Sequence, residues 1–292
     1  MKNPFNIVGI GEVLWDVFPD GPRFGGAPAN MICAITDLSG KNAKVNMISA
    51  VGADQLGDDA IAYLANRQVN VGLIEKVNYP TGTVTVMLDG ANQASYQFAD
   101  NCAWDNLVWS SKLAETAASI DAVCFGSLAQ RNAGSRETIH RFIQHVPKQA
   151  LKVFDVNLRV PFYSTEVILQ SLELANVLKL NEEELPIIAK VVGISGDNLE
   201  LLQQLKQLYQ LTTIAFTQGA QGAVLLHHDE VIEVPIVATT VIDTVGAGDS
   251  FTAALTLGLL KNKPLSEIGE FASLVSSYVC SQRGATPVLT HL

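Results

Sequence analysis

The residues with the clearest chemical character form the segment 243–251, which reads DTVGAGDSF. Gly246 and Gly248, separated by one small residue, allow a tight turn whose backbone can approach a ligand closely. An apolar, helix-like stretch follows, so the turn would present free N–H groups and the positive end of a helix dipole, which suits phosphate. Asp249 would be repelled by that anion. Its simplest role is to take the proton of a hydroxyl that attacks phosphorus.

The segments around this turn alternate between strand-like and helix-like patterns. Short apolar runs rich in β-branched residues predict strands at 6–11, 45–51, 122–126, 151–156, 176–180 and 212–217. Helical patterns are predicted at 25–38, 58–67, 135–145, 165–174, 182–192, 198–209, 247–260 and 265–282. Alternation of this kind predicts an α/β fold with a mainly parallel sheet covered by helices on both faces.

Two hairpins interrupt the alternation. β-rich runs at 83–88 and 94–98 flank Asp89-Gly90, a dipeptide typical of hairpin turns. We expect them to form a small β-sheet lid, built from about 12–24 and 73–101, on a single domain that spans 1–292. A second hairpin, 223–227 with 230–234, is expected near one edge of the main sheet.

Composition excludes several classes of protein. Hydrophobic residues make up 48% of the 292 residues against 16% charged, which argues against disorder. A net charge of −10 argues against nucleic acid as a partner. No run is long and apolar enough for a signal peptide or a membrane span. Four scattered cysteines and five histidines lack metal-ligand spacing, and the cysteines indicate a reducing, cytoplasmic location.

Polar side chains gather where the predicted strands end, which is where open parallel sheets bind ligands. Asp16 comes soon after the first strand, and the others follow later strands: Asp155, Asn157, Arg159, Asn181, Glu184, Thr217 and Gly219. Each has a purely structural alternative. Asp16 could be a solvated loop residue, Asp155 and Arg159 could form an ion pair, and the acids at 182–184 could simply begin a helix. Trp15 could cover a sugar face or pack within the lid.

Five segments together resemble the PfkB/ribokinase family of carbohydrate kinases. Segment 243–251 resembles the second family signature, DTxGAGD, and Gly25–Asn30 (GGAPAN) resembles the first, GGxxxN. Segments 155–159 (DVNLR), 181–184 (NEEE) and 217–222 (TQGAQG) are similar to the family runs DxNxR, NxxE and TxGxxG. The resemblance covers nearly the whole chain in the family's order. It implies a ribokinase-like three-layer α/β/α sandwich with a small β-sheet lid.

The resemblance also implies roles for individual residues. Asp249 would be the catalytic base, and the N–H groups around Gly246, Ala247 and Gly248 would form an anion hole. The sugar would bind to Asp16, Gly26, Asn30, Asn157 and Arg159. The nucleotide would bind to Thr217, Gly219, Gly222, Asn181 and Ser276. Glu184 would lie near Mg²⁺, through water, and Asp243 near a monovalent cation such as K⁺.

The implied reaction is transfer of the γ-phosphoryl group of ATP to a sugar hydroxymethyl. Segments 11–16 (GEVLWD) and 125–131 (FGSLAQR) look like those of bacterial fructokinases, so we expect D-fructose as substrate and fructose 6-phosphate as product. Segment 100–105 (DNCAWD) lacks the arginine that many relatives carry there, which leaves the identity of the sugar open.

Other functions stay open at this point. The alternatives within the same chemistry are kinases for ribose, a nucleoside or 2-keto-3-deoxygluconate. A non-catalytic sugar or nucleotide sensor is disfavoured by the presence of Asp249 and both glycines. A Rossmann oxidoreductase is disfavoured because no third glycine follows Gly9 and Gly11. Pairing of the lid with that of a second copy would give a homodimer.

Overall fold

The fold is organised around one large sheet. The computed structural model describes residues 4–88 and 94–292. Its nine-stranded sheet has the order β13-β12-β11-β10-β9-β8-β1-β4-β5. The strands from β11 to β5 pair in parallel, and β12 and β13 add an antiparallel edge. The bounds are β1 Phe5–Ile10, β4 Ala43–Gly52, β5 Asn70–Val77, β8 Ala122–Gly126, β9 Leu151–Asp155, β10 Val177–Asn181, β11 Thr213–Thr217, β12 Ala223–His227 and β13 Glu230–Val234.

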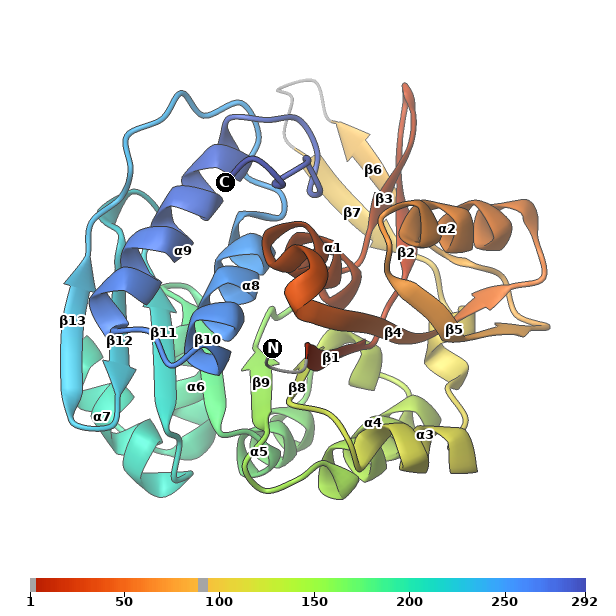
Figure 1. Cartoon of the computed structure of the whole chain (residues 1–292). Helices are drawn as coiled ribbons and strands as arrows, with labels where there is room; N and C mark the ends of the chain where they lie inside the picture. Colours follow the sequence, from red (N-terminus) through yellow and green to blue (C-terminus); the bar gives the residue numbers. More distant parts are fainter. Residues whose placement is uncertain (1–3, 89–93) are drawn as a thin grey trace.

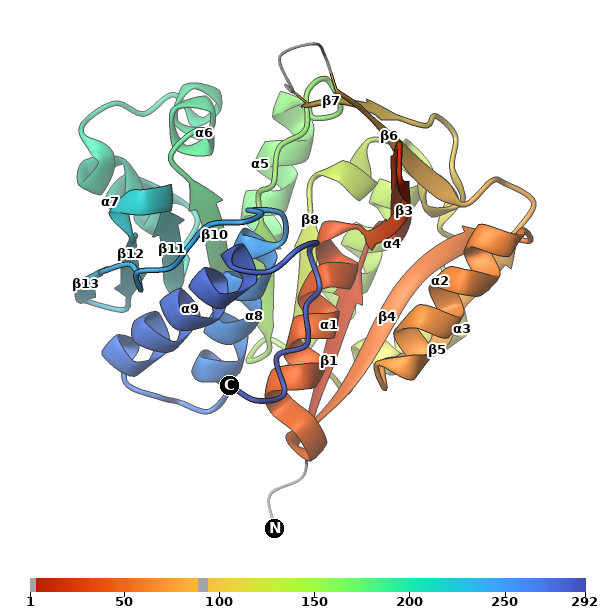
Figure 2. The ribbon, with the colours of Figure 1, turned by 90° about the horizontal axis from the view of Figure 1, so that it is seen from above.

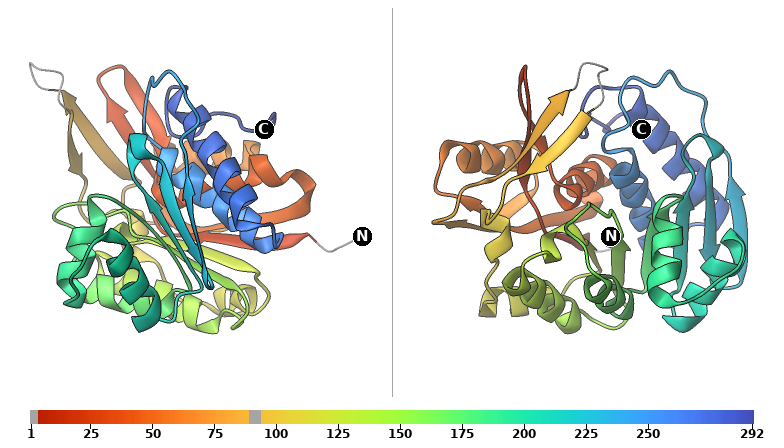
Figure 3. Two further views of the ribbon diagram at one scale, coloured as in Figure 1. Left: turned by 90° about the vertical axis from the view of Figure 1, so that its left-hand side faces the viewer. Right: turned by 180° about the vertical axis from the view of Figure 1, so that it is seen from behind.

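Helices cover both faces of this sheet (Figures 1 and 3). One layer contains α1 (Ala27–Ser39), α2 (Gln55–Asn66), α8 (Ala247–Leu260) and α9 (Leu265–Cys280). The other contains α3 (Ser111–Ala117), α4 (Ala133–His145), α5 (Thr165–Leu174), α6 (Glu184–Val192) and α7 (Asn198–Leu208). Each layer packs its own apolar cluster against the sheet, and both clusters are buried. The predicted three-layer α/β/α sandwich is therefore confirmed.

Local sequence explains where several helices begin. Asp54 caps α2 by accepting a hydrogen bond from the backbone N–H of Gly57. Asp197 and Glu200 form a capping box at the start of α7. In α1, Pro28 occupies the first turn, where its missing N–H costs nothing. Of these three helices, α1 carries a candidate site residue, Asn30.

A second sheet leaves the main body just after β1 (Figures 1 and 2). It has four strands in the order β3-β2-β6-β7 and corresponds to the predicted lid. Its bounds are β2 Leu14–Phe18, β3 Gly21–Gly25, β6 Gly82–Leu88 and β7 Ala94–Phe98. The predicted hairpin of β6 with β7 is present, while the Asp89-Gly90 turn lies outside the described residues.

The boundary of the lid differs from the expected one. Residues 73–77 belong to β5, which pairs in parallel with β4 in the large sheet. The second part of the lid therefore begins only at Gly82, the first residue of β6. The predicted boundary at 73 was wrong because no helix separates β5 from β6. Two strands that belong to different sheets therefore form one continuous β-rich region in the sequence.

Candidate active site

The glycine-containing turn before α8 has the geometry expected of an anion site. Gly246 is its N-cap and has a φ of 80°, and a Cβ there would lie 2.3 Å from the carbonyl oxygen of Ala285. Only glycine fits that position. Ala247 donates its N–H to the carbonyl of Thr244 at 3.2 Å. Within the described chain, the N–H groups of Gly248 and Asp249 have no acceptor, so they are free for a ligand.

Asp249 stands in the first turn of α8, beside these free N–H groups. Its Oδ2 accepts a hydrogen bond of 2.9 Å from Nδ2 of Asn30 in α1. Burial, helped by the negative charge of Asp155, raises the pKa of Asp249 to about 6, while Asn30, Lys179 and Arg159 act in the opposite direction. The carboxylate is therefore ionised at neutral pH yet basic enough to take a proton.

A cavity of about 650 Å³ opens beside Asp249. The lid contributes Asp16 from β2, and the loop after β9 contributes Asn157 and Arg159. The residues predicted to bind the sugar all line it: Asp16, Gly26, Asn30, Asn157 and Arg159. Burial raises the pKa of Asp16 to about 6, against the opposing charges of Arg159 and Arg23. Such a wall of carboxylate, amide and guanidinium groups suits a molecule with several hydroxyl groups.

Gly26 shows why the first motif needs a glycine. Its φ is 106°, and a Cβ would lie 2.4 Å from the carbonyl oxygen of Glu12. Asn30, one turn further on, is only 6% exposed, and its Oδ1 has no partner among the described residues. A buried amide oxygen without a donor is costly, so a ligand hydroxyl in the cavity would satisfy it.

A second cavity of about 610 Å³ lies on the other side of the turn. Every residue predicted to bind the nucleotide lines it: Thr217, Gly219, Gly222, Asn181 and Ser276. Its walls come from β10, β11, the loop after β11, the segment before α8, and α9. The Asn181 Oδ1 also accepts the N–H groups of Glu183 and Glu184 at 2.9 Å each, so it fixes the start of α6.

The two residues predicted near cations are placed differently from each other. Glu184 is 4% exposed, and its two oxygens accept the backbone N–H groups of Leu158 and Asn181. It lines neither cavity, whereas its neighbour Glu183 lines both. Asp243 lines the first cavity and accepts N–H groups from Val245 and Gly284, both at 3.0 Å. It thereby ties the turn before α8 to the C-terminal segment.

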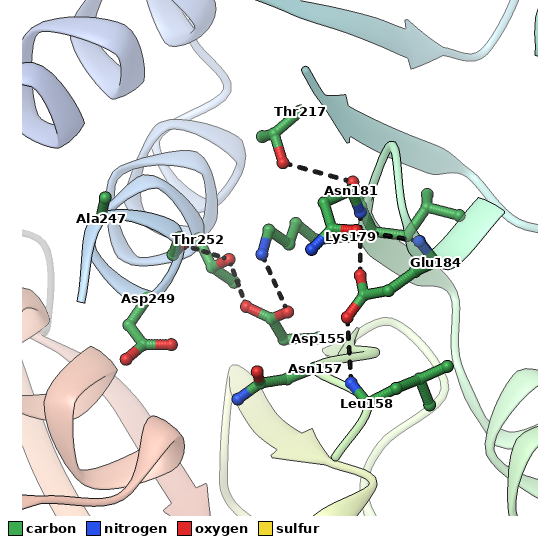
Figure 4. A network of polar contacts seen from close by, with 12 residues as sticks. Asp155, Asn157, Leu158, Lys179, Asn181, Glu184, Thr217, Ala247, Asp249 and Thr252 are labelled. Atoms are coloured by element: carbon green, nitrogen blue, oxygen red, sulfur yellow. Dashed lines mark hydrogen bonds and ion pairs between the residues drawn. The ribbon is translucent and has the colours of Figure 1, made fainter. Parts of the chain in front are cut away.

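A polar network lies beneath the turn (Figure 4). Asp155, at the end of β9, accepts a hydrogen bond of 2.8 Å from the Thr252 hydroxyl of α8 and pairs with Nζ of Lys179 at 3.1 Å. The alternative that Asp155 pairs with Arg159 is therefore wrong. Arg159 is exposed, and its Nη1 donates to the carbonyl of Leu158.

Two buried charged groups of the site were not predicted from the sequence. Lys179 interrupts the apolar strand β10, and Glu12 follows β1 with a side chain in the wall of the first cavity. A charged residue within or just after an apolar strand is the signal that could have found both. Trp15, by contrast, lines neither cavity. Its Nε1 donates to the carbonyl of Leu56 in α2 and its ring packs edge-on against Phe24 of β3, so it packs between the lid and α2.

Among residues 4–88 and 94–292, no group of three or more histidine, cysteine, aspartate or glutamate side chains is arranged to hold a metal ion. No helix there is long and apolar enough to cross a membrane.

A helix N-terminus with free N–H groups and a carboxylate beside it, placed between two cavities, is an arrangement that suits phosphoryl transfer. The model of the pfkB family of carbohydrate kinases matches residues 21–291. The chain therefore belongs to this family.

Individual relatives agree with the family match. A putative sugar kinase of Pyrococcus horikoshii is 32% identical over 301 residues, covering 96% of this chain and 91% of that protein. A fructokinase of Klebsiella pneumoniae is 30% identical over 263 residues, covering 86% and 83%. The structure of the Pyrococcus protein in complex with ATP superposes with a TM-score of 0.83 at 31% identity, covering 98% of this chain and 96% of that one.

Proposed function

We propose that this carbohydrate kinase transfers the γ-phosphoryl group of ATP to a hydroxymethyl group of a sugar, with D-fructose as the first candidate. The observation that carries the proposal is the position of Asp249. Asp249 lines the first cavity and accepts a hydrogen bond from Asn30. The helix turn that carries it also faces the second cavity. A base at this boundary can reach a hydroxyl on one side while a triphosphate approaches from the other.

The chemistry follows from the groups around it. Asp16 and Asn30 orient the acceptor hydroxyls, and Asp249 takes the proton as the hydroxymethyl oxygen attacks the γ-phosphorus. The bond between that phosphorus and the bridging oxygen of the β-phosphate breaks, and ADP leaves. The free N–H groups of Gly248 and Asp249 stabilise charge on the phosphoryl oxygens in transit. Closure of the lid over the sugar would exclude water, which could otherwise accept the phosphoryl group.

The nucleotide assignment is supported by the second cavity and by one relative. The Pyrococcus sugar kinase has been solved with ATP. In this chain the loop 217–222 and α9 leave a hollow of about 610 Å³ with an apolar wall that includes Val237 and Phe251. An adenine ring fits such a wall, with its phosphates directed to the N-terminus of α8.

Magnesium would be held mainly by the phosphates and by water, because Mg²⁺ sheds its hydration reluctantly. Asn181 and Glu183 line the place where the two cavities meet. Each Glu184 oxygen keeps a lone pair beyond the N–H group it accepts, so a contact through water remains compatible with its burial. Bound Mg²⁺ would neutralise the phosphate charge. Asp243 and nearby carbonyls would suit K⁺.

Fructose is favoured by the relatives. Fructokinases of Klebsiella pneumoniae, Salmonella typhimurium and Escherichia coli are 30%, 28% and 27% identical to this chain. Although segment 100–105 has no arginine, Arg23 and Arg159 line the cavity. The other candidate acceptors are ribose, a nucleoside and 2-keto-3-deoxygluconate.

The decisive experiment is a coupled assay of ADP release, with Mg²⁺, across fructose, ribose, glucose, nucleosides and 2-keto-3-deoxygluconate. We expect the highest kcat/KM with fructose. Strong preference for another acceptor would overturn the substrate but keep the reaction. Absence of ADP release with every acceptor, while ATP still binds, would favour a sensor. Repeating the assay with K⁺ or Na⁺ tests the monovalent cation, and light scattering tests whether the protein is a dimer.

A further inference from the structure

Lys179 occupies an unusual place for a lysine. It lies in β10 between the buried residues Leu178 and Leu180 and is itself only 6% exposed. Five described residues line both cavities, and among them Lys179 carries the single positive charge: Lys179, Asn181, Glu183, Thr244 and Gly248. Lys179 therefore stands at the boundary of the two cavities.

The hydrogen bonds of this ammonium are incomplete. A lysine ammonium has three N–H donors. Asp155 Oδ1 takes one at 3.1 Å, and no other described residue accepts from Nζ. Buried donors without acceptors cost free energy. The remaining N–H groups of the Lys179 ammonium are therefore available to a bound acceptor.

The position of Gly248 shows where the ammonium lies. A Cβ on Gly248 would be 2.8 Å from Nζ of Lys179, so the missing side chain makes room for the ammonium against the first turn of α8. The free N–H groups of Gly248 and Asp249 belong to the same turn. An anion bound to them would have Nζ as an immediate neighbour.

The ammonium is charged at working pH. Burial acts to lower the pKa of Lys179, but the charges of Asp155, Glu184 and Asp249 outweigh burial and raise it above its ordinary value. Asp155 is fixed in turn by the hydroxyl of Thr252 (Figure 4). The cation is therefore held in place before any ligand arrives, which is what stabilisation of a transition state requires.

We propose that Lys179 binds the phosphoryl group in transit, donating its remaining N–H groups to the non-bridging γ-phosphoryl oxygens as the group moves from ATP to the sugar. The proposal rests on the proposed kinase function. The phosphorus loses its bond to the β-phosphate oxygen and gains one to the hydroxymethyl oxygen, and Asp249 takes the proton. Lys179 keeps its own proton throughout and is not a second base.

The competing view is that Lys179 only stabilises the fold through its buried ion pair with Asp155. Lys179→Met separates the two roles if binding and catalysis are measured together with melting temperature. We expect kcat to fall at least about 10²-fold, the typical cost of losing one donor to a transition state. ADP affinity, measured by calorimetry, should stay within about threefold, whereas a non-hydrolysable ATP analogue should bind less tightly. A purely structural role would not distinguish the two nucleotides.

Lys179→Met leaves the Asp155 carboxylate buried without its cation, so that variant could fold poorly. The double variant Lys179→Met/Asp155→Asn removes both charges, and Asp155→Asn alone is its matched control. The proposal predicts that the double variant turns over at least about 10²-fold more slowly than the control. Equal turnover in these two proteins, or near-normal turnover in Lys179→Met, would overturn it. The comparison of analogue with ADP needs no sugar, so it stands apart from the sugar assay that tests the kinase function.

Discussion

The side-chain amide of Asn30 donates a hydrogen bond of 2.9 Å to the carboxylate of Asp249, although 219 residues separate the two in sequence. Asn30 is in the first turn of α1 and Asp249 in the first turn of α8, and the two helices pack against each other on the same face of the sheet. The residue proposed to bind the sugar therefore also positions the proposed base. This contact links the two motifs into one unit.

Replacing Asn30 should change both sugar binding and the pH dependence. Its hydrogen bond holds the pKa of Asp249 below the value that burial alone would give. Asn30→Ala should therefore move the acid limb of kcat/KM to higher pH and raise KM for the sugar about tenfold, roughly the loss of one or two hydrogen bonds. Steady-state kinetics between pH 5 and 9 measure both effects. An unchanged acid limb would show that the contact does not tune the base.

Asp249→Asn keeps the shape of the side chain and removes its basicity. Turnover should fall by about 10²–10⁴-fold, the usual contribution of a general base. ATP affinity should change little, because the N–H groups that face the phosphates belong to the backbone. Single-turnover kinetics and nucleotide calorimetry on the same preparation give both values. Near-normal turnover would remove Asp249 from its proposed role.

The wild-type protein should lose activity on the acid side of neutrality. Burial raises the pKa values of Asp249 and Asp16 to about 6 each, and both must be ionised, the first to take a proton and the second to accept hydroxyl groups. Activity should therefore rise with pH through about 6 and level off above 7. The measurement is kcat/KM as a function of pH, with the coupling enzymes in excess at every pH. A flat profile down to pH 5 would contradict it.

The burial of Glu12 should lower the free energy of unfolding as the pH rises. Glu12 is 2% exposed, its Oε1 accepts the N–H of Ala27, and its Oε2 has no partner among the described residues. Burial raises its pKa from 4.5 to about 7, with Asp249 adding to the rise and Arg159 opposing it. The folded protein holds this proton more tightly than the unfolded chain, so Glu12 costs stability as pH rises from about 4.5 through 7.

The matched variant for this cost is Glu12→Gln, which has the same shape and can still accept from Ala27. It should leave stability nearly unchanged at pH 4 and increase the free energy of unfolding at pH 8 by roughly 3 kcal/mol at most. Urea unfolding at both pH values provides the measurement. A variant that is equally destabilised at the two pH values would show that Glu12 contributes by packing alone.

Much of the fold could be predicted because its signals are local. Alternating strands and helices predicted the sheet, and the glycines before α1 and α8 marked the starts of those two helices. The short helix α3 (Ser111–Ala117) was not predicted, and β5 was read as lid. In both cases the deciding interaction is with a distant segment, because α3 packs on α4 and β5 pairs with β4.

In the candidate site too, local motifs could be predicted and contacts between distant segments could not. Residues predicted to bind the sugar and the nucleotide do line two adjoining cavities. Lys179 was missed because its meaning depends on Asp155, which comes from another strand, and on Gly248, which comes from a helix almost seventy residues away in sequence. The NxxE spacing identified Glu184, but it could not show that Glu183 faces the cavities and Glu184 the backbone. The direction of each acid is set by the way Asn181 starts α6.

The close fit of Gly246 against the carbonyl of Ala285 has a consequence for biosynthesis. The turn that begins α8 is backed by a segment that comes 39 residues later in the chain, and Asp243 accepts a hydrogen bond from the N–H of Gly284 in the same segment. On the ribosome, the strands and most helices could pair and pack while this segment was still inside the exit tunnel. The sheet would therefore exist before the turn that begins α8 had its back wall, and the turn would take its final shape only when this later segment packed against it.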